Sequence, residues 1–289
     1  DVAGTLDVNY TLIGGKVYAY GDCAGGGFGF NASTEVLTKE LTIKPTSVQG
    51  RYYVGGFIGA NVVNLSQNLT MEYFRADNRL GSIVGEAFCG GIIGYQRTYT
   101  AKQFGTGALL DEMDAQQSAI LPGIDGKTNL PGAEAASANT HTLTIRDSRN
   151  ENNSLQTITN NIPIRAWLYV GGIVGYCENN SKLVISNCVN EGTIGTPAND
   201  DTQHTHAKNG VNLATFIAGE VDGRQLADGA ADVTICPIGG IIGVNLKNQV
   251  IEHCTNKGTI TGTSGIGGIV GLNAGSVRSC NLTENFGST

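Results

Sequence analysis

The stretch that decides the fold is residues 170–177, which read VGGIVGYC. Its centre, two glycines followed by two apolar residues and a third glycine, recurs along the chain. The copies are GGGFG from Gly25, GGFIG from Gly55, GGIIG from Gly90, GGIVG from Gly171, GGIIG from Gly239 and GGIVG from Gly267. They start 30, 35, 81, 68 and 28 residues apart, so three spacings are one repeat long and two are a repeat carrying an insertion. Self-similarity at a period of about 20–50 residues is typical of a solenoid or another array of repeats.

Agreement between the copies extends beyond the glycines. An apolar residue precedes each glycine pair, and a polar residue stands six positions after the first glycine in every copy except the one with Cys177. Alternate residues of 169–176 place Val170, Val174 and Tyr176 on one face of a strand and Tyr169 and Ile173 on the other. Both faces are apolar or glycine, which predicts a strand covered on both sides whose glycines let another backbone approach closely. The glycines with this structural role are Gly55, Gly56, Gly59, Gly90, Gly91, Gly94, Gly171, Gly172, Gly175, Gly239, Gly240, Gly243, Gly267, Gly268 and Gly271.

A second shared segment follows the last three copies. It reads ISNCVNEGTI (185–194), IEHCTNKGTI (251–260) and VRSCNLTENF (277–286). Equivalent residues of stacked repeats form columns. We therefore expect Cys188, Cys254 and Cys280 to form a ladder of buried free thiols, in preference to a disulfide or a metal site. Asn187, Asn190 and Asn256 are expected at turns, where an asparagine ladder is favoured over a ligand site.

These motifs resemble the GLUG repeat, whose typical form is a GGLVG-x-N strand followed by a second strand and an N-x-G-x-[IV] turn. The match is closest over 170–194, 238–260 and 266–283 and weaker over 24–61 and 89–96. GLUG repeats occur in secreted or surface-attached bacterial proteins, including adhesin-like proteins. The resemblance implies an all-β fold, a β-solenoid of the right-handed parallel β-helix type, and a role in attachment at the bacterial cell surface.

Composition limits the classes of protein that the chain can belong to. Glycine makes up 42 of the 289 residues, about twice the usual ~7%. Proline numbers only 6, so the glycines belong to ordered backbone and not to a disordered tract. We expect a single solenoid domain over 1–289, with insertions at about 97–162 and 196–235, which the repeat does not cover.

Charge and hydropathy exclude two kinds of partner. The chain carries 25 acidic and 18 basic residues, a net charge of −7, which argues against binding nucleic acid through a basic patch. No run approaches the ~18 apolar residues of a membrane span. Asp1 is followed by neither a basic nor an apolar leader, so we expect that an export signal was removed or was never present.

The insertions hold the candidate chemistry. Residues 107–121 have the apolar spacing of a short amphipathic helix that ends at Pro122. His204 and His206 alternate by two beside Asp200 and Asp201, a weak candidate for a zinc site against the alternative of a solvated loop. There is no HExxH motif, GxSxG elbow, P-loop or GxGxxG fingerprint, so we expect neither a catalytic residue nor a cofactor.

Aromatic residues give a further candidate site. In three consecutive copies an aromatic residue stands two positions before the first glycine of the motif. These residues are Tyr53, Phe88 and Tyr169, and Trp167 is close by. If exposed, this row would form a platform that binds sugar rings or a partner protein; if buried, it would be a second core. The four residues are therefore candidate binding residues, with burial the favoured alternative.

These patterns favour a non-catalytic, adhesin-like module, secreted or on the bacterial surface, which binds a glycan or a host protein. A second hypothesis is a carbohydrate-active enzyme on a β-helix, with Asp111, Glu112 and Asp114 or Asp200 and Asp201 as carboxylate candidates. A third is a structural stalk that spaces another domain from the cell.

Overall fold

The VGGIVGYC stretch folds as two short strands joined by a corner, and not as the single strand that alternation predicts. β21 (Leu168–Gly171) ends at the corner and β22 (Val174–Cys177) begins after it. A Cβ atom on Gly171 would lie 1.9 Å from the carbonyl oxygen of Val174, so the corner requires glycine. The same two-strand arrangement is found at each of the other copies of the motif.

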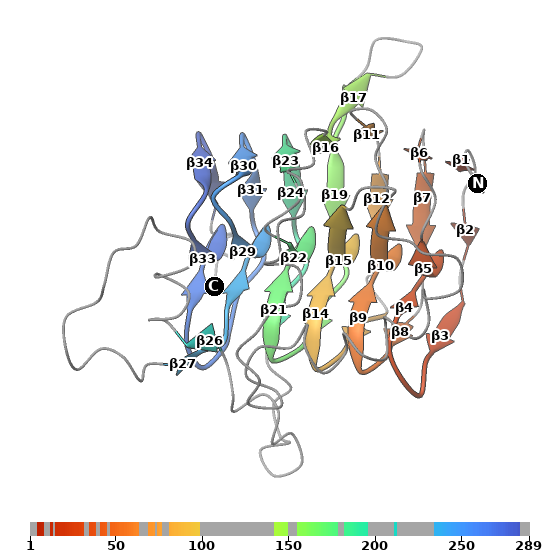
Figure 1. The fold of residues 1–289 in the computed structure, drawn as a ribbon, viewed down its shortest axis with the longest axis horizontal. Helices are drawn as coiled ribbons and strands as arrows, with labels where there is room; N and C mark the ends of the chain where they lie inside the picture. The colour runs from red at the N-terminus through yellow and green to blue at the C-terminus, as the bar shows by residue number, and fades with distance from the viewer. Residues whose placement is uncertain are drawn as a thin grey trace, which may run out of the picture.

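Figure 1 shows the computed structural model of the chain, which describes residues 5–8, 12–13, 15–31, 35–38, 41–44, 47–63, 69–72, 74–76, 81–98, 142–149, 155–178, 182–195, 211–212 and 234–283. Every regular element within these residues is a β-strand. Among them no helix has the length and hydrophobicity needed to cross a bilayer. The helix expected over 107–121 lies outside the described residues.

The two halves of the glycine motif build two six-stranded parallel sheets. Sheet 1 contains β4 (Ala24–Gly25), β9 (Tyr52–Gly55), β14 (Ala87–Gly90), β21, β28 (Ile238–Gly239) and β32 (Ile266–Gly267). Sheet 2 contains β5 (Phe28–Asn31), β10 (Ile58–Val63), β15 (Ile93–Thr98), β22, β29 (Ile242–Asn245) and β33 (Val270–Asn273). Equivalent glycines pair directly, as Gly90 does with Gly55 and Gly171, so the copies are aligned in register.

Three further parallel sheets complete the fold. Sheet 3 contains β11 (Leu69–Glu72), β16 (Thr142–Arg146), β23 (Lys182–Ser186), β30 (Gln249–Glu252) and β34 (Ser276–Arg278). Sheet 4 contains β2 (Leu12–Ile13), β7 (Leu41–Lys44), β12 (Phe74–Ala76), β19 (Ile158–Asn160), β24 (Cys188–Asn190), β31 (Thr255–Asn256) and β35 (Asn281–Leu282). Sheet 5 contains β3 (Lys16–Tyr18), β8 (Ser47–Gln49), β13 (Ile83–Val84), β20 (Ile164–Arg165) and β25 (Ile194–Gly195).

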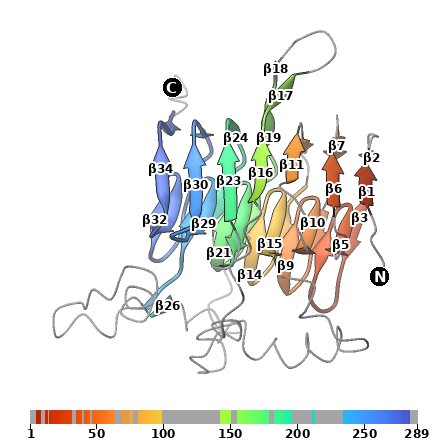
Figure 2. The same ribbon diagram turned by 45° about the horizontal axis from the view of Figure 1, so that its top comes forward.

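The chain visits these sheets in a fixed order, from sheet 1 to sheet 5 and then sheet 1 again, and we call each passage a coil. Figures 1 and 2 show the strands of successive coils side by side from the N-terminal to the C-terminal end. β1 (Thr5–Val8) and β6 (Glu35–Thr38) form a separate parallel pair. The described residues therefore form an all-β, β-helix-like fold of stacked coils.

Two apolar clusters lie on opposite faces of sheets 1 and 2. The inner core contains residues of all five sheets, such as Val54, Ile83 and Ile145. The outer core contains residues of sheets 1 and 2 and of the segments next to them, among them Tyr53 and Tyr176. Sheets 1 and 2 are thus covered by apolar side chains on both faces.

The strict alternation expected over 169–176 is wrong, because the chain bulges at the corner. The amides of Ile173 and Val174 both donate to the carbonyl of Ile241, at 2.9 and 3.1 Å, which is the geometry of a β-bulge. Both side chains consequently enter the inner core, whereas Tyr176, expected on the same face as Val174, enters the outer core.

The first insertion is shorter than the sequence indicates. β16, β19 and β20 pair with the equivalent strands of the neighbouring coils, so residues 142–146 and 158–165 belong to the third coil. Within the predicted range, 97–162, the described departure from the coil is the antiparallel hairpin of β17 (Ser148–Arg149) and β18 (Leu155–Gln156). In the second insertion β26 (Val211–Asn212) pairs antiparallel with β27 (Thr234–Ile235).

Candidate functional site: an aromatic column and a buried ion pair

The aromatic row predicted from the sequence exists as a column on sheet 1. Tyr53, Phe88 and Tyr169 have left-handed backbone conformations, with φ of 56°, 56° and 54°. This conformation is uncommon outside glycine, and the ordinary up-down alternation fails where it occurs. Leu168 and Tyr169, though adjacent, therefore both enter the outer core, while Val170 enters the inner core.

The rings of the column stack on one another. The centroids of Phe88 and Tyr169 are 4.6 Å apart with 9° between the ring planes, and those of Tyr53 and Phe88 are 5.1 Å apart with 23°. Tyr95 and Tyr176 from sheet 2 meet the column edge-on, with centroids 5.0 Å from Tyr53 and from Tyr169 respectively. Such stacked and edge-on pairs add to the stability that area burial provides.

The column is a second core. Tyr53, Phe88 and Tyr169 are only 4%, 1% and 4% exposed, so the alternative of an exposed platform does not hold for these three residues. Trp167, which packs against the same cluster, is half-buried. Of the four candidate binding residues, it is the one that is not fully buried, although Nε1 of its ring is buried.

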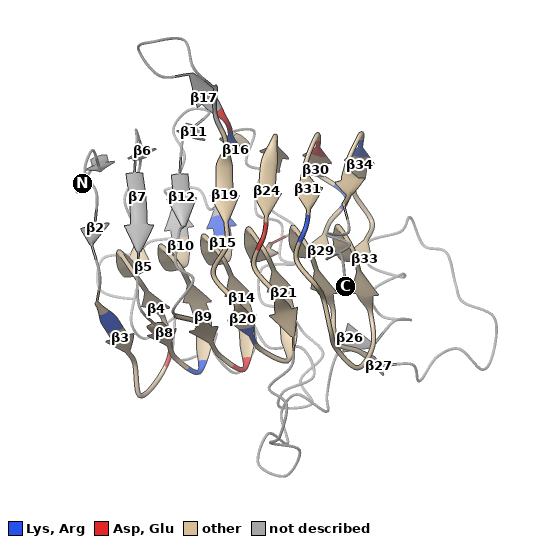
Figure 3. Ribbon diagram, turned by 180° about the vertical axis from the view of Figure 1, so that it is seen from behind, with Lys and Arg blue, Asp and Glu red and all other residues tan. Residues whose placement is uncertain are grey.

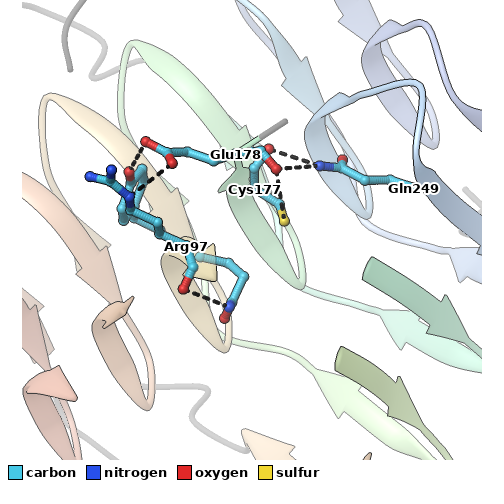
Figure 4. Close-up of polar contacts among 6 residues, drawn as sticks. Arg97, Cys177, Glu178 and Gln249 are labelled. Carbon is cyan, nitrogen blue, oxygen red and sulfur yellow. Dashed lines mark hydrogen bonds and ion pairs between the residues drawn. The ribbon is translucent and has the colours of Figure 1, made fainter. Parts of the chain in front are cut away.

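A buried ion pair closes the outer core at the end of sheet 2. The Nε of Arg97 lies 3.1 Å from Oε2 of Glu178, and the hydroxyl of Tyr95 donates to the other carboxylate oxygen. The side chains of Arg97 and Glu178 are only 13% and 9% exposed. Figure 4 shows the carboxylate of Glu178 between the third and fourth coils, directed toward Arg97.

The backbone around Glu178 is fixed from both sides. Its amide donates to the carbonyl of Gln96 at 3.0 Å, in the preceding coil. From the following coil, Nε2 of Gln249 donates to the carbonyls of Cys177 and Glu178, at 2.9 and 3.2 Å (Figure 4). The ion pair is therefore held by three successive coils.

Burial determines how this carboxyl group titrates. Desolvation raises the pKa of Glu178, while the positive charge of Arg97 and the hydrogen bond from Tyr95 act in the opposite direction. Burial also raises the pKa of the Tyr95 hydroxyl well above its ordinary value, and the charge of Glu178 adds to that rise. The arrangement places one paired carboxylate beside a phenol that stays protonated.

The cysteines form the ladder that the repeat predicts. All seven are free thiols; Cys188 and Cys254 are buried as expected, whereas Cys280, in the last described coil, is only partly buried. Cys254 and Cys280 interact with each other through their side chains, as do Cys254 and Cys188. Each thiol also lies near a backbone carbonyl of the preceding coil, at 3.5 Å from Sγ of Cys254 to the oxygen of Ile185. The column of cysteines is thus part of the inner core.

Asparagine side chains form ladders of hydrogen bonds. In sheet 4, Nδ2 of Asn160 donates to Oδ1 of Asn190 at 2.8 Å, and Nδ2 of Asn190 donates to Oδ1 of Asn256 at 2.7 Å. Asn187, also expected at a turn, has a left-handed conformation, with φ of 53°. Its Nδ2 donates to a carboxylate oxygen of Asp147.

The candidates in the insertions lie outside the described residues. These are His204, His206, Asp200, Asp201, Asp111, Glu112 and Asp114. The residues that the structure does describe include no group of three or more histidine, cysteine or acidic side chains arranged to hold a metal ion.

Sequence reasoning missed Arg97 and Glu178. A signal for them was present, because each follows the polar position of its repeat copy by one residue, and Gln96 pairs with Cys177 in register. Oppositely charged residues at equivalent positions of consecutive copies predict an ion pair between coils. Comparisons of the chain with protein-family models, curated proteins and solved structures return no match.

Proposed function

We propose that the chain is a non-catalytic, adhesin-like module, secreted or held at a bacterial surface, whose two insertions bind a glycan or a host protein. The observation that supports the proposal is where the insertions leave the coils. The first follows β15 in sheet 2, and the second follows β25, which ends immediately before sheet 1. They leave consecutive coils at the two borders of the face formed by sheets 1 and 2. Segments that project from one face of a repeat array frequently form its binding surface.

We further infer that the β-helix-like array is a right-handed solenoid. Each coil links parallel strands of one sheet by a long crossover, and such crossovers are right-handed in about 98% of cases. A stack of this kind buries a continuous core in every coil, so it can carry long insertions without losing its own stability.

The rival hypothesis of a glycosidase needs two carboxyl groups about 5–10 Å apart beside a sugar. Glu178 is a buried carboxylate, but its contacts are a guanidinium and a phenol, which is the pattern of a structural ion pair. Glu178 therefore gives the enzyme hypothesis no catalytic carboxylate, and the carboxylates named for that hypothesis lie outside the described residues.

The test compares the full chain with two insertion variants. In one, residues 198–233 are replaced by a short Gly-Ser linker, and in the other residues 101–139 are replaced in the same way. A matched control shortens residues 150–154, which connect β17 to β18. Each protein is applied to a glycan array and to immobilised matrix proteins, with thermal melting as the check on folding.

We expect a specific ligand for the full chain and the control, and loss of that ligand in at least one insertion variant that still melts cooperatively. Binding that survives both replacements would contradict the assignment to the insertions. Turnover of a polysaccharide panel by the full chain, absent in Asp111→Asn or in Asp200→Asn, would favour the enzyme hypothesis instead.

A further inference from the structure

A row of three sulfur atoms runs along the start of sheet 4. Cys188 is the first residue of β24, and Cys254 and Cys280 directly precede β31 and β35. These strands pair in register, so the three cysteines hold the same position in the fourth, fifth and sixth coils. Neighbouring parallel strands are about 4.8 Å apart. We call these three residues the thiol row.

The side chains of the thiol row point in the same direction. Each Sγ lies 3.3 Å from the carbonyl oxygen two residues before it in the chain. Each also lies near a carbonyl oxygen of the preceding coil, at 3.7 Å for Cys188, 3.5 Å for Cys254 and 3.8 Å for Cys280. The thiol of Cys254 interacts with both of the others. The sulfur atoms therefore follow one another at the spacing of the coils.

The surroundings of the thiol row suit a cation. The carbonyl groups that face the sulfur atoms present the negative ends of their dipoles. The neighbouring thiol of Cys188 and burial raise the pKa of Cys254, so a thiolate without a cation beside it is disfavoured. In Figure 3, β24 and β31 are tan, and the coloured charged residues stand in the turns beside them. These strands thus lack the carboxylates that Ca²⁺ and Mg²⁺ prefer.

We propose that Cys254 and Cys280 bind one soft monovalent metal cation, Cu(I), in a straight line between their sulfur atoms. Thiolate sulfur is a soft ligand that favours Cu(I), zinc and iron–sulfur clusters. A metal–thiolate bond is about 2.3 Å long, as it is for zinc, so two opposite bonds span about 4.6 Å. This span is close to the strand spacing of about 4.8 Å.

The same geometry argues against the other uses of paired thiols. A disulfide needs Cβ atoms about 3.8 Å apart, which is closer than neighbouring coils bring parallel side chains. Structural zinc is tetrahedral and takes four ligands around one point, which a straight row cannot supply. Accordingly, the described residues hold no group of three such ligands. Binding of Cu(I) oxidises nothing: the cation replaces two thiol protons, which leave to the solvent.

Access favours the pair of Cys254 and Cys280 over that of Cys188 and Cys254. Cys280 is partly exposed, whereas Cys188 and Cys254 are buried. A cation that enters from the solvent therefore reaches the outer pair first. The site uses no residue of either insertion, so it does not depend on the proposed function.

The experiment titrates Cu(I), supplied as its acetonitrile complex under nitrogen, into the full chain in competition with the chelator bicinchoninate. Zn(II) forms a parallel arm. Cys280→Ser and Cys254→Ala each remove one ligand. The matched controls are Cys188→Ser, which alters the row and keeps both ligands, and Cys23→Ser, at a partly exposed thiol outside the row. X-ray absorption at the copper edge identifies the ligand atoms, and thermal melting checks folding.

We expect one equivalent of Cu(I), bound by two sulfur atoms. Loss of either ligand should weaken binding by about 100-fold or more, since loss of an outer partner of a ligand alone costs 10–100-fold. Cys188→Ser and Cys23→Ser should leave it unchanged, and Zn(II) should not displace the copper. Unchanged affinity in Cys280→Ser, or copper held by nitrogen or oxygen, would overturn the proposal. Loss in Cys188→Ser with retention in Cys280→Ser would contradict the placement.

Alkylation of the full chain gives a second test that needs no variant. The chain is treated with iodoacetamide with and without one equivalent of Cu(I), and the modified cysteines are mapped by mass spectrometry. We expect Cu(I) to protect Cys280 and to leave Cys23 reactive. Equal modification of Cys280 in both samples would count against the site even if a variant failed to fold.

Discussion

Side-chain amides of sheets 2 and 4 bond to the amides of the next coil, and these amide-to-amide bonds all point in one direction. In sheet 2, Nδ2 of Asn31 donates to Asn61 at 2.7 Å and that of Asn61 to Gln96 at 2.6 Å. Cys177 occupies the next place, where a thiol cannot continue the ladder. Beyond it, Oδ1 of Asn245 is buried with no hydrogen-bond partner among the described residues. A buried unsatisfied acceptor destabilises the folded state.

Replacement of Cys177 by asparagine is therefore expected to stabilise the protein. The new Nδ2 would donate to Oδ1 of Asn245, and the new Oδ1 would face Gln96. We expect the free energy of unfolding in urea to rise by about 1 kcal/mol. Cys177→Ala is the control, because it removes the thiol without supplying a donor. A Cys177→Asn variant no more stable than the alanine control would contradict this account of the ladder.

The carboxyl group of Glu178 makes stability depend on pH. Its pKa is raised in the folded state above its ordinary value of 4.5, chiefly by desolvation. The folded state thus binds the proton more tightly than the unfolded state does. The stability that this proton contributes is fully present below the pKa of Glu178 in the unfolded chain. It is lost as the pH rises through the higher pKa of Glu178 in the folded protein.

Glu178→Gln tests this titration. Glutamine keeps the shape of the side chain but cannot titrate, so the variant lacks this part of the pH dependence. We expect the free energy of unfolding of the wild type, relative to that of the variant, to fall between pH 4 and pH 7. Urea unfolding at four pH values measures the difference. A difference that stays constant with pH would show that Glu178 has the same pKa in both states.

At the scale of the strand and its corner, glycine is required by backbone contacts between coils. A Cβ atom on Gly172 would lie 2.2 Å from the carbonyl oxygen of Gly240 and 2.4 Å from Cγ of Asn190. Gly21, also in a corner, would meet nothing within 4 Å. The two positions differ in their surroundings and not in residue type.

Gly172→Ala is expected to lower the free energy of unfolding by about 3 kcal/mol, because a backbone atom of the next coil must move. Gly21→Ala is the matched control and should change it by less than about 0.5 kcal/mol. Thermal melting of both variants makes the comparison. Equal melting temperatures would remove close approach of coils as the reason for the glycine repeat.

Columns of equivalent residues were predictable from the sequence, whereas the conformation of the corners was not. The repeat alone aligns Cys188 with Cys254 and Asn190 with Asn256, because stacking in register follows from self-similarity. Nothing in the residues Tyr53 and Tyr169 indicates a left-handed backbone, which is usually marked by glycine or asparagine. Their conformation comes from the tertiary contacts of the outer core. The alternation of side chains that the sequence predicts is therefore wrong at these residues.

Across the whole molecule, stability is expected to be highest in the middle of the stack. Ile173 and Ile241 in the fourth and fifth coils are fully buried, whereas Ile266 and Leu282 in the last described coil are 44% and 61% exposed. The strands of that coil that lie in sheets 1 to 4 pair with a neighbour on one side. In a stack whose coils contact mainly their neighbours, the outermost unit opens most easily.

Hydrogen exchange followed by mass spectrometry checks this gradient. We expect amides of β21 and β22 to exchange about 100-fold more slowly than those of β32 and β33, since local opening costs more in the centre. The antiparallel pair of β17 and β18 serves as an internal reference outside the stack. Uniform exchange across the coils would indicate one cooperative unit in place of a graded stack.

The length of the insertions could be only partly predicted. Residues 142–146 carry no glycine motif, yet they pair with β11 and β23 as a strand of sheet 3. Strands of this sheet vary in sequence from coil to coil, so a search for sequence repeats does not detect them. Burial of Leu143 and Ile145 in the inner core is what fixes their place.

The one-directional amide ladder also bears on how such a protein can lengthen. An asparagine inside the ladder of sheet 4 accepts a hydrogen bond from the coil before it and donates one to the coil after it, as Asn190 does between Asn160 and Asn256. A tandem duplication in the gene that spans one whole period would therefore insert a coil whose amides already match those above and below. Growth by duplication needs no compensating substitution at these positions, and segments 185–194 and 251–260, which are identical at six of ten positions, fit such a history.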